Sequence, residues 1–187
     1  MLKTLLFACF FIFTITVFAQ DSTSFLKPGQ FKINALLVGG SLSYEQRLSN
    51  ANTIVFESAF QYGFIYQSSS YNDGIHKYNI TPALSVEGRH YYHFKERLAK
   101  QKKITNNASN FWSLQAGYLF KPIISKTNTY TGYSDAIFVA PSWGIQRSLG
   151  KSFSLELLLG VEAGYKISSD SWGAGPATGL KISYIIK

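Results

Sequence analysis

Cysteine is almost missing from this sequence of 187 residues, because Cys9 is the only one, and charged residues are scarce at 15%. Average proteins carry about 25% charged residues. Beyond the N-terminal segment there is no apolar run of about 18 residues, which excludes a transmembrane helix there. Since Cys9 lies inside the N-terminal segment, the rest of the chain has no disulfide bond and no thiol chemistry.

The N-terminal segment has the pattern of a secretory signal peptide. Lys3 supplies a positive start, the residues from Leu5 to Phe18 are apolar apart from two threonines, and Ala19 precedes the expected cleavage site. We expect residues 1–19 to be removed, with an uncleaved anchor or lipidation at Cys9 as alternatives. Residues 20–29 are then a periplasmic leader, and residues 30–187 form the folded domain.

From Phe31 onward, apolar residues recur with a period of two, which is typical of β-strands. The expected strands cover residues 31–38, 41–48, 53–67, 78–92, 110–121, 135–147, 152–166 and 176–186. Gly39-Gly40 is expected to form the tight turn of the first hairpin. Pro82 and Pro141 each remove a ladder donor, so the local register around them stays open.

These strands indicate a membrane barrel rather than a soluble sandwich. Each has one apolar, aromatic face, while the other face mixes glycine, alanine, serine and charge. Such strands suit a barrel whose outer surface meets lipid and whose narrow lumen holds small and paired polar residues. The predicted fold is therefore all-β: an eight-stranded antiparallel up-and-down transmembrane β-barrel. With a periplasmic N-terminus, the polar connections 68–77, 122–134 and 167–175 lie outside.

Charged residues on the polar faces are expected to meet inside the barrel. The expected lumenal charge network contains Glu45, Arg47, Glu57, Glu87, Arg89, Glu156, Glu162 and Lys181, and Lys32 lies on the same side. Carboxylates and cations on several strands favour buried ion pairs, with acid–base or metal chemistry as the alternative. No catalytic, cofactor or metal site is expected.

The formal net charge of +8 could suggest nucleic acid. The densest basic run, Lys95 to Lys103, falls in the connection 93–109, which is the one long connection on the periplasmic side. An exported protein does not meet nucleic acid, so we expect a solvated turn or one that faces lipid headgroups.

Several short stretches resemble the small eight-stranded outer-membrane β-barrel domain family. They are Lys32-Ile33-Asn34, Gly39-Gly40, Leu42-Ser43-Tyr44-Glu45, Arg89-His90-Tyr91-Tyr92 and the closing Gly179-Leu180-Lys181-Ile182-Ser183-Tyr184. The resemblance implies the outer membrane of a Gram-negative cell and insertion by the barrel-assembly machinery. In that family the last strand usually ends in an aromatic residue, whereas this chain ends in Ile185-Ile186-Lys187.

Three classes of function follow from the sequence. The first is a structural or envelope barrel without an open pore, whose outer loops bind a ligand through Tyr71, Tyr130 and Tyr133. The second is a small channel for hydrophobic solutes. The third is a membrane-embedded lipid A acyl hydrolase, for which His76 near Asp73 and Ser70 is the only candidate group on the outer side, since His90 and His93 fall at the periplasmic end.

Overall fold

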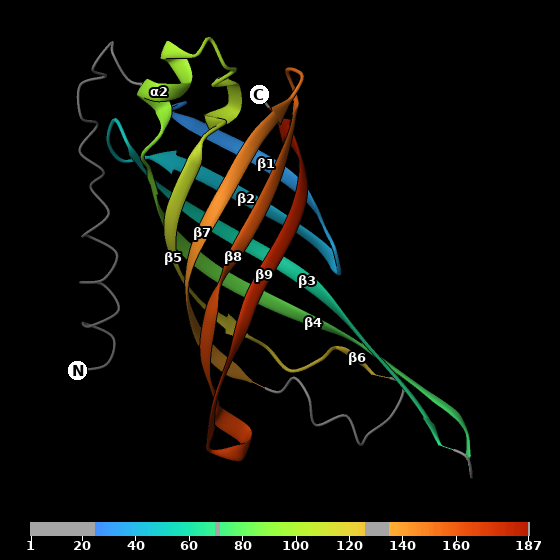
Figure 1. Ribbon diagram of the computed structural model, residues 1–187. Coiled ribbons are helices and arrows are strands. Elements are labelled where there is room, and N and C mark those ends of the chain that lie inside the picture. Colours follow the sequence, from blue (N-terminus) through green and yellow to red (C-terminus); the bar gives the residue numbers. More distant parts are fainter. Residues whose placement is uncertain (1–24, 70–71, 126–134, 187) are drawn as a thin grey trace, which may run out of the picture.

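The computed structural model describes residues 25–69, 72–125 and 135–186, and side chains are described for all of these except 63–69, 72–78 and 125. Figure 1 shows a twisted antiparallel barrel with the helix α2 at one end. The expected signal peptide, residues 20–24 of the leader, and the candidate binding residues Tyr71, Tyr130 and Tyr133 lie outside the described residues. We call the end that carries α2 the capped end.

Regular elements account for most of the described chain. The long strands are β1 (Gly29–Leu36), β2 (Gly39–Arg47), β3 (Asn52–Ser69), β4 (Asn72–Tyr91), β5 (Asn110–Leu119), β7 (Ala136–Leu149), β8 (Phe153–Lys166) and β9 (Ser171–Ile186). The short elements are α2 (Phe94–Ala99), η1 (Thr105–Asn107), β6 (Ile124–Ser125) and η2 (Ile167–Ser169). None of the helices in these residues has the length and hydropathy needed to cross a lipid bilayer.

Each long strand pairs antiparallel with the next, and β1 pairs with β9 from Phe31–Ile186 to Leu36–Lys181, which closes the barrel. The predicted all-β class, the eight strands and the up-and-down order are therefore confirmed. The additional β6 continues the path of β5 and pairs with β4 at Asn79 and Ile80.

The first hairpin differs from the prediction. Leu36 pairs with Gly39, so the two turn residues are Leu37 and Val38, and Gly39-Gly40 begins β2. Gly39 has φ +134°, and a Cβ built there would lie 2.1 Å from the carbonyl oxygen of Phe60 on β3. The glycine is thus needed for its backbone angle and for the close approach of β3, and not for the turn.

Two connections that we predicted as loops are largely strand. Within 68–77, β3 reaches Ser69 and β4 begins at Asn72, and within 167–175, β9 begins at Ser171. The polar and glycine-rich composition of these stretches concealed their pairing, because backbone hydrogen bonds in a hairpin do not depend on side-chain hydrophobicity. In Figure 1 both hairpins extend beyond the rest of the barrel, away from the capped end.

The two strand prolines do not shift the register. Phe60 pairs with Pro82 in the part of the β3–β4 ladder that runs without a register shift from Asn52 to Gln67, and the Pro82 carbonyl accepts a hydrogen bond from the Phe120 amide. Around Pro141, the pairing of β7 with β8 passes from Val139–Ala163 to Ser142–Gly160 without a change of register. A missing donor is therefore tolerated at each position because the neighbouring pairs hold the strands in place.

The connection 93–109 is not an open turn. It contains α2 and η1, and its residues Asn106, Asn107, Ala108 and Ser109 have no exposed surface. Phe94 packs with Leu26, Tyr91 and Phe111 in an apolar cluster at the same place. We call residues 93–109 the cap, because they fold back onto the barrel end.

The strands expose their apolar faces and bury their polar faces, which is the reverse of the usual pattern in a soluble protein. Large apolar side chains point outward, as in Phe31, which is 60% exposed, and Leu42, which is 61% exposed. Polar residues such as Gln30, Asn34 and Ser43 are buried on the opposite faces of the same strands. The apolar part of the interior is small, and its second cluster consists of Ala59, Ala83, Leu119 and Ala136.

Candidate functional site: the charged interior

Seven ionisable side chains meet inside the barrel, in the half nearer the cap. We call them the charged cluster: Lys32, Glu45, Glu57, Glu87, Arg89, Glu156 and Lys181. They come from β1, β2, β3, β4, β8 and β9, and each lies on the inward face of its strand. The alternation of the strand turns them inward, and closure of the barrel brings them together.

Arg89 is the centre of the charged cluster. Its guanidinium donates to both carboxylate oxygens of Glu156, at 2.7 and 2.9 Å, and to Glu87 at 2.7 Å. It lies over the ring of Phe111, 4.6 Å from the ring centroid. A bidentate, charge-assisted pair of this kind is among the strongest interactions that side chains make.

The two lysines of the charged cluster pair with the remaining carboxylates. Lys32 Nζ lies 2.6 Å from Glu45 Oε2, and Lys181 Nζ lies 2.6 Å from Glu57 Oε2. Lys181 also lies 3.9 Å from Glu156, so it links its own pair to that of Arg89. Three cations thus face four carboxylates with almost no exposure to solvent, and each carboxylate has at least one cationic partner.

Neutral polar groups bind the second carboxylate oxygens of Glu45 and Glu57. Glu45 Oε1 accepts from the Tyr91 hydroxyl at 2.8 Å and from Asn107 Nδ2 at 3.0 Å, while the Ser41 hydroxyl donates to Glu57. Gln146 accepts from Arg89 and Tyr91 and donates to the Asn106 carbonyl oxygen. The charged cluster is therefore bonded directly to the cap.

Two of the predicted network residues lie elsewhere. Arg47, at the end of β2, is half-buried and donates to the Leu26 carbonyl oxygen at 3.0 Å. Glu162 is half-buried on β8, nearer the uncapped end, and among the described residues it has no ion-pair partner. The other six predicted residues, Glu45, Glu57, Glu87, Arg89, Glu156 and Lys181, are brought together by the fold.

The prediction missed four residues that complete the cluster. Tyr91 is in phase with Arg89 on β4, and Gln146 lies on the inward face of β7. The period of two could therefore have identified both residues. Asn106 and Asn107 carry no such signal, because they lie in an irregular connection with left-handed φ angles of +57° and +58°. Lys32 was expected on this side but not as a member of the network.

The two histidines whose side chains are described, His90 and His93, form no catalytic group with other described residues. His90 is exposed, with Nδ1 2.8 Å from the Asn52 amide oxygen, and His93 lies 3.5 Å from Glu96. The His76 and Asp73 side chains and the whole of Ser70 lie outside the described residues. In the part of the chain that is described, no group of three histidine, cysteine or acidic residues is arranged to hold a metal ion.

The paired charges of the charged cluster can hold the strands together. Every residue of the cluster is already engaged by a partner of opposite charge. In comparisons with known proteins, no family model, no curated protein and no solved structure matches this chain.

Proposed function

We propose that this protein is an integral outer-membrane β-barrel with a side-chain-filled lumen, which has a structural role in the envelope or binds through its outer connections. The observation that carries the proposal is the inverted burial, with a paired ionic cluster inside and large apolar residues outside. In water the outward residues would form an apolar surface that soluble monomers rarely expose. In a bilayer the same residues contact lipid, and closure of the barrel by β1 and β9 satisfies the strand edges over the capped half.

Strand length supports a membrane span. β8 has 14 residues. At a rise of about 3.4 Å per residue and a tilt of about 40°, such a strand extends roughly 35 Å along the barrel axis. The apolar band of outer-membrane barrels is about 25 Å tall. The strand is therefore long enough to cross the hydrocarbon and enter both interfaces.

Aromatic pairs lie near both ends of the outer surface. Phe153 and Tyr184 have ring centroids 5.2 Å apart at the capped end, and Tyr165 and Trp172 have centroids 5.1 Å apart at the other end. Between them on β8, Leu157, Leu159 and Val161 are exposed. Aromatic girdles on either side of an apolar band are typical of membrane barrels.

The filled end disfavours an open pore. A hydrated channel would have to pass the charged cluster and then the cap, where Asn106 and Asn107 are fully buried. The expected signal peptide directs the chain out of the cytoplasm, and the outer membrane is where such barrels insert. Outer-membrane lipid and the assembly machinery are the proposed partners, with no nucleic acid.

Membrane fractionation and gel mobility test this proposal. The protein should be recovered with outer membranes, stay folded in mild SDS, and change its gel mobility after boiling. Recovery from the soluble periplasmic fraction without a heat shift would contradict it. Planar-bilayer recording is expected to show no steady conductance, and lipid A should have the same mass with and without the protein. A steady conductance or deacylated lipid A would favour the channel or the hydrolase.

A single substitution tests lipid contact directly. Leu159→Arg places a charge midway along β8, where about 2–4 kcal/mol of folding free energy should be lost in lipid vesicles. Leu98→Arg is the matched control, because Leu98 is 49% exposed on α2, outside the barrel wall. Equal unfolding free energies for the two variants in vesicles would contradict the membrane span.

A further inference from the structure

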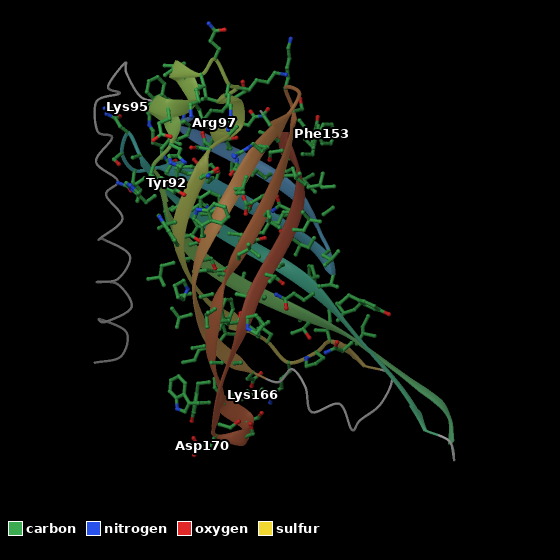
Figure 2. All side chains as sticks on the ribbon, viewed as in Figure 1. Tyr92, Lys95, Arg97, Phe153, Lys166 and Asp170 are labelled. Carbon is green, nitrogen blue, oxygen red and sulfur yellow. The ribbon has the colours of Figure 1, made fainter. Side chains whose placement is uncertain are left out.

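A polar hollow of about 150 Å³ lies on the outside of the capped end, between the cap and the ends of β5 and β7. Its lining carries four cations, one carboxylate, one histidine and one amide: Arg97, Lys100, Lys102, Arg147, Glu96, His93 and Asn110. In Figure 2 Arg97 lies on α2, at the same end of the barrel as Tyr92 and Lys95. The hollow is thus separate from the charged cluster inside the barrel.

The two guanidiniums of the hollow are held in place but lack counterions. Arg97 Nη2 donates to the Lys103 carbonyl oxygen at 2.7 Å, and Arg147 donates to the Gln146 carbonyl oxygen and the Asn110 amide oxygen at 2.8 and 2.7 Å. Neither guanidinium forms an ion pair within the described residues. Arg97 Nε is buried without a hydrogen-bond partner there. Glu96, the one carboxylate, lies 3.5 Å from His93.

The hollow and the charged cluster differ in their balance of cations and carboxylates. Inside the barrel every cation has a carboxylate within 4 Å, whereas here four cations gather around a single acidic side chain. Fixed guanidiniums with free donors are suited to bidentate recognition of an oxyanion such as phosphate. An anion in the hollow would neutralise the cations that line it.

The position of the hollow indicates where that anion comes from. Arg147 lies on the outward face of β7 with Trp143 and Ile145, and Asn110 lies on the outward face of β5 with Trp112. Trp143 donates to the Tyr92 hydroxyl at 2.6 Å, and Tyr92 stacks on Trp112. Along the proposed lipid-facing wall, apolar residues are therefore followed by aromatic residues and then by the basic hollow. A bilayer has the matching order, from hydrocarbon through the interface to the charged headgroups.

We propose that this hollow binds the phosphate group of an anionic phospholipid in the leaflet at the capped end. The lipid as the source of the phosphate rests on the proposed membrane function, while the affinity for a phosphate oxyanion rests on the hollow alone. The site anchors the cap at the interface and sets the depth of the barrel.

Retention of lipid by the folded protein tests the site. Native mass spectrometry from detergent, after incubation with phosphatidylglycerol or phosphatidylcholine, should show preferential retention of phosphatidylglycerol. Lys100→Gln with Lys102→Gln should weaken that retention by about 25-fold, since each lysine near an anionic surface contributes about fivefold. Lys95→Gln with Lys103→Gln is the matched control, because both lysines are exposed on the same cap but do not line the hollow. The control should retain the lipid as the unmodified protein does.

Each other outcome argues against the site or changes its ligand. Equal losses for the two double variants would mean a diffuse surface charge, and no preference for phosphatidylglycerol would overturn the proposal. Full displacement of the lipid by millimolar inorganic phosphate would assign the hollow to free phosphate and overturn the lipid source. If the protein shows no heat shift, the membrane function fails, yet binding of inorganic phosphate by the soluble protein still tests the hollow.

Discussion

Near the cap, side chains from strands far apart in the sequence cross the lumen and bond to one another, whereas the other half of the barrel is held by hairpin pairing. There, among the described residues, β3 beyond Tyr62 pairs only with β4, and β9 before Leu180 pairs only with β8. The inward residues of that part of β9 are small, including Gly175, Ala177 and Gly179. Figure 1 shows the β3–β4 hairpin diverging from the β8–β9 hairpin at this end.

The difference comes from the length of the first hairpin. Because β1 and β2 contain only 8 and 9 residues, their turn lies partway along the barrel and closes it only over the capped half. The turn residue Leu37 is 79% exposed, and its amide donates to the Leu180 carbonyl oxygen, while the Val38 carbonyl oxygen accepts from Tyr62. An apolar turn with its backbone bonded to both neighbouring strands is compatible with lipid. We therefore expect stability to be concentrated in the capped half.

Removing the central cation of the charged cluster should have the largest effect. Arg89→Met leaves Glu87 and Glu156 buried without their main partner, which should cost about 3–5 kcal/mol of folding free energy. Arg47→Met is the matched control, because Arg47 donates only to a backbone carbonyl oxygen and to no carboxylate. Urea unfolding in detergent micelles or vesicles measures both. Similar losses for the two variants would show that the ion pairs do not concentrate stability near the cap.

The sequence predicts which strand residues point inward, but it does not predict which of them become partners across the lumen. The period of two was enough to predict that Glu57, Glu87 and Glu156 point inward, since alternation on a strand is local. It could not show that Glu162, in phase with Glu156, has no ion pair among the described residues, because partners depend on which strands approach across the lumen. The cap was missed for a similar reason, since Asn106 and Asn107 are buried by contacts distant in the sequence.

Disrupting the pairing of β2 with β3 in the barrel wall should cause the second-largest loss of folding free energy. Gly39→Ala forces an alanine into φ +134° and places its Cβ 2.1 Å from the Phe60 carbonyl oxygen, so about 2–4 kcal/mol should be lost as β2 and β3 separate. Gly150→Ala is the matched control, with φ +77° and open space around the added Cβ. It should cost about 1–2 kcal/mol. Equal losses in the heat-shift midpoint would show that backbone angle alone matters, and not the approach of β3.

The bond between the cap and the charged cluster should contribute least of the three. Asn107→Gly keeps the left-handed φ of +58° acceptable but removes the amide that donates to Glu45 and accepts from the Lys27 amide nitrogen. The expected loss is about 1–2 kcal/mol, because Glu45 keeps Lys32 and Tyr91 as partners. Hydrogen exchange should show faster exchange in the cap and at residues 25–28, with little change in the hairpins of the other half. Thr105→Ala, at an exposed position of η1, is the control. Faster exchange spread over the whole barrel would mean that the two halves unfold as one unit, which would remove the distinction between them.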